Sequence, residues 1–222
     1  MLNLPKNVWI LTACLALFMS LSVFMLFVGG IIGSVLAPST SLSTLPIATI
    51  VVGTAVSIIP AIRLMSIFGR KKVFLGACLY TILLIGLCIF SIINESFFLF
   101  SFASFCLGGT VAVMQQFRFA AIESVELEQR PLATAIVLLG GLISAYLGTE
   151  IATLGIDYFE TDFAGSFLIL ALLFVVAFIL MCFFEPAEKF KEQINKSTRP
   201  LKNIIKQGSF IVAVCAATTG YV

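Results

Sequence analysis

The chain has 222 residues, of which 60% are apolar and 11% are charged. A soluble domain carries about 25% charged residues, so this composition excludes an ordinary soluble domain and indicates an integral membrane protein. The formal net charge is only +2, the cations lie in short loops or a mixed-charge segment, and histidine is absent, which argues against nucleic-acid binding, metal centres and histidine-based catalysis.

Long uncharged runs predict six membrane-spanning helices, because each run reaches the ~20 residues that a helix needs to cross a bilayer. A cleaved signal peptide is the alternative for the first run, but its apolar region would be only ~7–15 residues long. Pro38 and Pro46 interrupt the long uncharged stretch at residues 7–62, which therefore holds two spans. The expected spans are about residues 8–34, 45–65, 73–93, 97–121, 132–154 and 163–184.

The sequence after the sixth run changes character. Residues 185–206 combine Lys and Arg with Glu and contain two prolines, as expected of a solvated linker. Residues 207–222 become apolar again, and we expect them to be the start of a seventh helix in a longer protein. The predicted organisation is a six-helix bundle at 1–184, a charged linker at 185–206 and a truncated seventh helix at 207–222.

The positions of the cations predict the orientation of the spans. If the N-terminus is cytoplasmic, every Lys and Arg falls in a cytoplasmic segment, as expected because positive residues near helix ends are retained on that side. The outer loops then hold only Glu95, Asp157, Glu160 and Asp162. The cytoplasmic cations are Lys6, Arg63, Arg70, Lys71, Lys72, Arg118, Arg130, Lys189, Lys191, Lys196, Arg199, Lys202 and Lys206. The helical build fits a bacterial inner, plasma-type membrane.

Two features of the amino-acid sequence resemble those of a known protein family. Gly69-Arg70-Lys71-Lys72 follows the second span, and a long charged linker follows the sixth. With six spans and the start of a seventh, the chain resembles the N-terminal half of a Major Facilitator Superfamily transporter. The resemblance implies an all-α bundle of two inverted three-helix repeats, which transporters of this kind contain. Glycine pairs in the first span (Gly29-Gly30) and the fourth (Gly108-Gly109) are a weak sign of that repeat.

The resemblance also implies a gating role for the basic turn, residues 69–72, together with Arg63. The family signature has an earlier Gly and an Asp, and Ile62 and Ser66 stand in those places. The turn is therefore predicted either to hold the bundle in one state of a transport cycle or simply to fix topology. Both interpretations stay open.

Span four holds the candidate substrate-binding residues Gln115, Gln116 and Arg118. Charged groups at membrane depth cost about 2.5 kcal/mol or more unless they are paired or wetted, so this polar stretch is expected to line an inner vestibule where Arg118 attracts an anionic or polar solute. The alternative is that Arg118 extends to the headgroups or pairs with Glu123.

Glu150 is the one acid deep inside a predicted span, and it is the candidate site for a coupling proton or cation. The alternative is a carboxylate at the outer boundary that reaches water. Gly141 and Gly148 in the same span, like Gly29 and Gly33 in the first, are interpreted as sites of close helix packing, because small residues spaced by three and four let backbones approach.

The function that these features predict is secondary transport of a small solute by alternating access, with membrane lipid, the solute and a C-terminal half of the same transporter as partners. No cofactor is expected. No Gly-x-x-x-x-Gly-Lys-Ser/Thr motif occurs, so the sequence gives no support for an ATP-driven pump or another enzyme. Two alternatives remain: a six-span channel or permease that works as an oligomer, and a membrane scaffold or assembly protein without a transported solute.

Overall fold

The computed structural model describes residues 4–155 and 163–186, together with Gln207, Gly208, Val212 and Ala216. By its contacts the chain divides into two units, Met1–Ala187 and Glu188–Val222. The predicted linker, apart from Glu185 and Pro186, and most of the predicted seventh helix lie outside the described residues, as do Asp157, Glu160 and Asp162. The fold below is that of the first unit.

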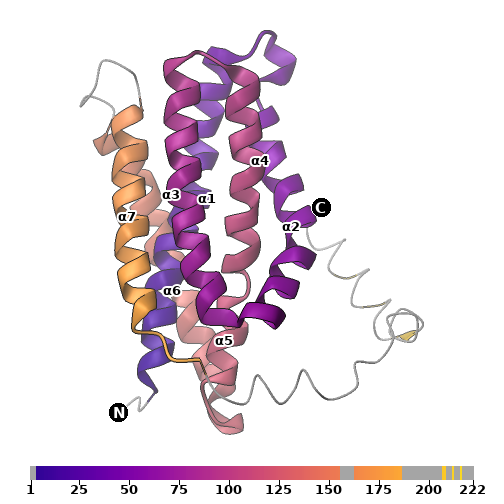
Figure 1. The fold of residues 1–222 in the computed structure, drawn as a ribbon, viewed down its shortest axis with the longest axis vertical. Helices are drawn as coiled ribbons and strands as arrows, with labels where there is room; N and C mark the ends of the chain where they lie inside the picture. Colours follow the sequence, from indigo (N-terminus) through magenta and orange to yellow (C-terminus); the bar gives the residue numbers. More distant parts are fainter. Residues whose placement is uncertain (1–3, 156–162, 187–206, 209–211, 213–215, 217–222) are drawn as a thin grey trace. The chain divides into compact units, whose positions relative to one another are not determined.

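The first unit is a bundle of antiparallel helices with no strand among its described residues (Figure 1). Six helical segments are long and apolar enough to cross a membrane, as the sequence predicted. The helices are α1 (Lys6–Leu36), α2 (Leu45–Phe68), α3 (Arg70–Ile93), α4 (Phe97–Met114), α5 (Phe117–Glu123), α6 (Arg130–Leu154) and α7 (Ala164–Cys182), with 3₁₀ turns at Thr40–Leu42 and Leu127–Gln129.

Proline and glycine set several helix boundaries. Pro46 and Pro131 lie in the first turn of α2 and α6, where a missing N–H costs no helical hydrogen bond. Gly69 alone separates α2 from α3, and its φ of 84° lies in the left-handed region that favours glycine. The chain can therefore change direction within one residue, so that α3 begins where α2 ends.

The fourth span differs from the single continuous helix that the sequence predicted. α4 ends at Met114 and α5 begins at Phe117, with a turn at Gln115 and Gln116. The Gln116 N–H donates to the Val113 carbonyl, 3.0 Å away, which is the tighter bond of a 3₁₀ turn. The two helices together still form one membrane-crossing segment, Phe97–Glu123.

The helix pairs repeat a pattern. α1 packs most extensively on α6, α2 packs most extensively on α4, and α3 packs on α7. In span numbers these pairs are one with five, two with four and three with six. If spans one, two and three are exchanged with spans four, five and six, the pair one–five becomes the pair four–two, and the pair three–six stays the same. Two inverted three-helix repeats require this symmetry.

Glycines mark the crossing points of the two extensive pairs. A Cβ on Gly140 of α6 would lie 2.6 Å from the Thr12 carbonyl oxygen, and one on Gly148 would lie 2.7 Å from Cβ of Val23 in α1. A Cβ on Gly108 of α4 would collide with the α2 backbone at Gly53 and Thr54. Of the glycines interpreted as packing positions, Gly148 is confirmed, whereas Gly141 faces only the Met19 side chain, at 3.3 Å, and a Cβ on Gly29 would meet nothing closer than 3.6 Å.

Candidate functional site

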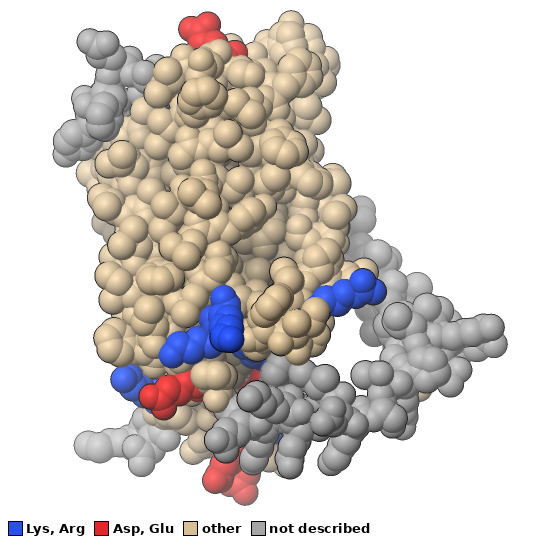
Figure 2. Space-filling model, viewed as in Figure 1, with Lys and Arg blue, Asp and Glu red and all other residues tan. Residues whose placement is uncertain are grey.

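The described cations that neighbour the helix ends share one end of the bundle, which we call the basic end. Lys6 and Arg70 begin α1 and α3, and Arg63 lies in the second-to-last turn of α2. Figure 2 shows that the Lys and Arg side chains visible on this face lie at the lower end, below a broad uncharged surface. This is the distribution that the alternation of cations predicted, while the membrane side that this end faces stays a prediction.

Three successive cations begin α3, and their side chains point in different directions. Successive residues of an α-helix are about 100° apart around the axis, so residues 70–72 sweep through about 200°. Arg70 is buried, Lys71 is half-buried and Lys72 is exposed. The three cations of this short turn therefore lie in three different environments, although they are consecutive in the sequence.

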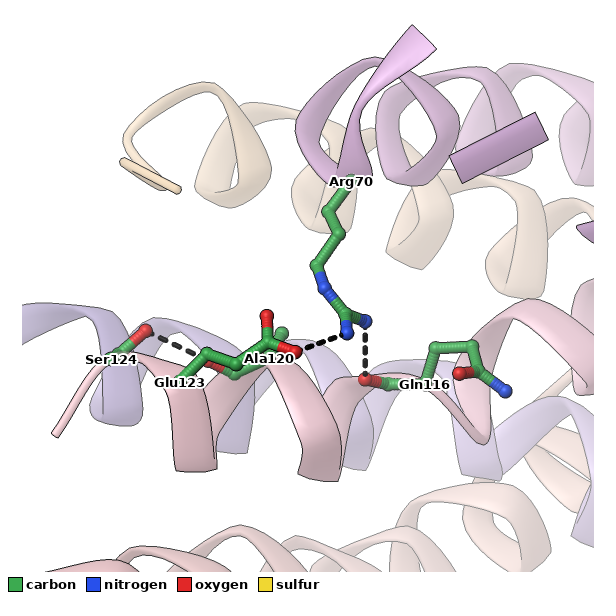
Figure 3. Close-up of polar contacts among 5 residues, drawn as sticks. All are labelled: Arg70, Gln116, Ala120, Glu123 and Ser124. Carbon is green, nitrogen blue, oxygen red and sulfur yellow. Dashed lines mark hydrogen bonds and ion pairs between the residues drawn. The ribbon is translucent and has the colours of Figure 1, made fainter. Parts of the chain in front are cut away.

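Arg70 points into the bundle toward α5 (Figure 3). Its Nη2 donates to Oε1 of Glu123 at 2.6 Å, and its Nη1 donates to the Gln116 carbonyl at 3.4 Å. The Arg70 side chain is only 9% exposed and that of Glu123 is 26% exposed, so this ion pair is largely shielded from water. It joins the start of span three to the last part of span four.

The break in span four gives Arg70 its two acceptors. The Gln116 carbonyl belongs to the turn between α4 and α5, and Glu123 is the last residue of α5. Ser124 follows, and its hydroxyl donates to the Ala120 carbonyl at 2.8 Å, which satisfies a carbonyl at the helix end (Figure 3). Arg70 therefore contacts α5 at both of its ends, through the Gln116 carbonyl before its first residue and through Glu123, its last residue.

Lys71 points toward the end of α7. Its Nζ donates to the Cys182 carbonyl at 2.7 Å, which places a positive charge at the negative end of that helix. Asn7 of α1 exchanges two hydrogen bonds with the Glu185 backbone, at 2.5 and 3.2 Å. The ammonium of Lys6 lies 5.4 Å from the centre of the Phe183 ring. Spans one, three, four and six are thus tied together at the basic end.

Phenylalanine rings of the same four spans pack on one another. The Phe117 ring of α5 lies 5.0 Å from Phe18 of α1 and 4.7 Å from Phe74 of α3, edge to face in both cases. Phe18 also lies 4.9 Å from Phe174 of α7. All four rings are fully buried, so α5 is fixed by its ring as well as by the ion pair.

The side chains of the remaining predicted site residues take no part in the Arg70–Glu123 ion pair or in the ring cluster. Gln115 and Arg118 are exposed, and the Gln116 side chain is half-buried. The Arg118 guanidinium lies 5.0 Å from the centre of the neighbouring Phe119 ring. Glu123 pairs with Arg70, so the alternative in which Glu123 pairs with Arg118 is wrong.

Glu150, Arg63 and Lys72 have no ion pair among the described residues. Glu150 is half-buried in α6, whereas Arg63 and Lys72 are exposed. Ser66, which stands where the family signature has Asp, donates its hydroxyl to the Arg63 carbonyl of its own helix at 2.7 Å. The described part of the chain contains no group of acidic, Cys or His residues that could hold a metal ion.

Sequence reasoning missed Glu123 as the partner of Arg70. The two residues are 53 positions apart and nothing in the local text links them. The available signal was indirect: Glu123 is the first acid after the polar stretch of span four, and the basic turn lies at the same end of the bundle. Only the packing of α5 brings the two groups together.

The six membrane-crossing segments, their repeated pairing and the basic end define a polytopic, integral membrane protein with the architecture of a transporter bundle. The chain belongs to the Major Facilitator Superfamily, whose family model matches residues 8–222. Membership of this superfamily indicates a transport protein and not an enzyme.

The chain is also similar to a curated protein, the riboflavin transporter RfnT of Brucella anthropi. The two are 32% identical over 225 residues, an alignment that covers 97% of this chain and 55% of the relative. The chain thus spans about half the length of the relative that it matches. No solved structure matches significantly.

Proposed function

We propose that the chain forms the first six-span half of a secondary transporter, which carries a small solute across a bacterial inner membrane by alternating access. The observation that carries this proposal is the match to the superfamily model over residues 8–222. The partner would be a second six-span bundle, against which this one rocks around a site near the midplane. The positive-inside rule supports a cytoplasmic location for the basic end, and hence for the N-terminus and the linker.

The ion pair of Arg70 supports a mechanical role for the basic turn. Rocking requires a bundle that moves as one body, and Arg70 and Lys71 join the inner ends of spans three, four and six. Because both cations are engaged within the bundle, a gating contact with the second half falls to an exposed group such as Arg63. In this proposal Arg70 and Lys71 hold the bundle together while Arg63 contributes to closing the cytoplasmic side.

The solute that we propose is riboflavin or a related flavin. The support is the similarity to a protein named as a riboflavin transporter, which extends over almost all of this chain. Gln115 and Arg118 are exposed near the basic end and can offer hydrogen bonds to a polar solute, with Gln116 beside them. Glu150 is the proposed group for a coupling proton or cation.

The proposal is tested by uptake of radiolabelled riboflavin into cells or vesicles that contain the full-length protein. We expect saturable uptake, and faster entry when unlabelled riboflavin is loaded on the opposite side, because a carrier exchanges solute and a channel does not. Uptake without this acceleration would favour the oligomeric channel or permease. No uptake of any flavin would refute the proposed solute.

Glu150→Gln separates coupling from solute binding in the same vesicles. If Glu150 couples transport to an ion gradient, the variant loses uphill uptake but keeps exchange, because exchange needs no net coupling. Thr149→Ser, next to it in α6, is the matched control and should retain both activities. Unchanged uphill uptake in Glu150→Gln would remove Glu150 from the mechanism.

A further inference from the structure

An apolar groove of about 450 Å³ lies between α2, α3 and α4. Both α2 and α3 pack on α4, and they join at Gly69, so the groove is the space between two helices that share one end (Figure 1). Leu64 and Phe68 line it from α2, Gly76 lines it from α3 and Val113 forms part of its floor on α4.

Lys72 is the charged residue of this groove. It lies in the first turn of α3, at the basic end, where the headgroups of a bilayer meet the helix. Arg70 and Lys71 point away from the groove to Glu123 and the Cys182 carbonyl. Lys72 is exposed and makes no hydrogen bond or ion pair with the described residues.

The rest of the groove offers little to a polar ligand. Besides Lys72 its polar residues are Ser57 and Tyr80, and Tyr80 already donates its hydroxyl to the Cys106 carbonyl at 3.0 Å. The groove is therefore positive at the headgroup level and apolar toward the membrane interior. This distribution of charge is complementary to a molecule with an anionic head and a hydrocarbon tail.

We propose that the groove binds one anionic phospholipid, whose phosphate pairs with Lys72 and whose acyl chain lies between α2 and α3. Basic pockets between membrane helices on the cytoplasmic side bind anionic headgroups in this way. An acyl chain there would fill the space between two helices that do not fill it themselves. The residues that line the groove do not include Gln115, Gln116, Arg118 or Glu150, and the proposed lipid site does not depend on which solute is carried.

The test uses full-length protein purified in detergent, delipidated and titrated with phosphatidylglycerol or phosphatidylcholine, with bound lipid counted by native mass spectrometry. The wild-type protein should bind one phosphatidylglycerol more tightly than phosphatidylcholine. Lys72→Gln should weaken phosphatidylglycerol binding about fivefold, the factor expected for one basic residue near an anionic headgroup. Arg63→Gln, which removes an exposed cation outside the groove, should change it little.

Gly76→Leu tests the acyl-chain part of the site. A Cβ on Gly76 meets no atom within 4 Å, so the larger side chain enters the groove without a clash. Gly86 of the same helix is equally open but does not line the groove, so Gly86→Leu is the matched control. Gly76→Leu should lose the bound lipid while Gly86→Leu keeps it.

Three results would overturn the proposal. They are equal binding of the two lipids by the wild-type protein, unchanged phosphatidylglycerol binding by Lys72→Gln, and retention of the lipid by Gly76→Leu. A monodisperse profile in size-exclusion chromatography establishes that each variant is folded.

Discussion

Neutralising Glu123 is the sharpest test of the Arg70 ion pair. Glu123→Gln keeps the size and one hydrogen-bonding oxygen of the side chain but removes its charge. Arg70 then stays buried, with the Gln116 carbonyl 3.4 Å from Nη1 and an amide in place of the carboxylate 2.6 Å from Nη2. The substitution therefore removes the carboxylate charge that pairs with a buried cation while the cation stays, which is more costly than removing both charges.

The exposure of the two side chains sets the expected magnitude. An exposed ion pair contributes about 0.2–1 kcal/mol, whereas breaking a buried one costs about 3–5 kcal/mol. Arg70 is 9% exposed and Glu123 is 26% exposed, which places this pair between the two limits. We expect Glu123→Gln to lower the free energy of unfolding by about 2 kcal/mol, a factor of about 30 in the folded-to-unfolded ratio.

The assay is a double-mutant cycle in the full-length protein, with unfolding followed in mixed detergent and denaturing-detergent micelles. The cycle compares Glu123→Gln, Arg70→Gln and the double variant with the wild-type protein. A direct pair predicts a coupling energy of about 1–3 kcal/mol, with the double variant less damaged than the sum of the single ones. Glu128→Gln, an exposed acid of the following 3₁₀ turn, is the matched control and should change stability by less than about 0.5 kcal/mol.

A coupling energy below about 0.5 kcal/mol would refute the reasoning, because two groups that touch and are shielded from water must interact by more than that. Arg70→Lys adds a second criterion. A lysine can reach one acceptor as a point charge but does not reproduce the planar fork that meets both Glu123 and Gln116. We therefore expect Arg70→Lys to recover only part of the stability that Arg70→Gln loses.

Two further substitutions test the helix contacts by the same unfolding assay. Gly108→Ala places a methyl group against the α2 backbone and should lower the free energy of unfolding by about 1–3 kcal/mol. Gly86→Ala, whose Cβ meets no atom within 4 Å, is the control and should stay within about 0.5 kcal/mol of the wild-type protein. Equal effects of the two substitutions would contradict the tight crossing of α2 and α4. Thr110→Val removes a buried hydrogen bond of 2.7 Å between the Thr110 and Thr81 hydroxyls. It should lower the free energy of unfolding by only about 0.6 kcal/mol, because the Thr81 hydroxyl keeps its hydrogen bond to the Ala77 carbonyl. A loss above about 2 kcal/mol would contradict this account.

The spans could be predicted from sequence because the bilayer imposes the rule that generates them. Each segment must satisfy its own backbone hydrogen bonds across about 30 Å of hydrocarbon, so the length of an uncharged run nearly determines the helix. Leu45, Ile93, Phe97 and Leu154 were accordingly placed at the ends that the structure shows. The rule concerns single segments, and it carries no information on which segment packs on which.

The features that the sequence did not reveal all depend on packing. The break at Gln115 and Gln116 follows no proline or glycine, and its stable form depends on the burial of the Phe117 ring among rings from other spans. Gly53 lies at the crossing of α2 and α4, and Thr49 and Ser57 stand four residues to either side of it, but this small-residue spacing does not say which helix it meets. The groove beside Lys72 lies where α2 and α3 diverge over α4, and no sequence pattern predicts it.

The basic turn lacks the acid of the family signature, because Ser66 stands in its place, yet Arg70 of the turn still has an acidic partner in Glu123. Ser66 bonds to its own helix and offers no charge, so the resemblance alone would leave Arg70 without a local counter-ion. The structure supplies one from α5, through a break that turns Glu123 toward the bundle interior. The cost of burying Arg70 depends on the packing of span four, and so a substitution that straightens the turn at Gln116 should weaken the ion pair even though it removes neither charge.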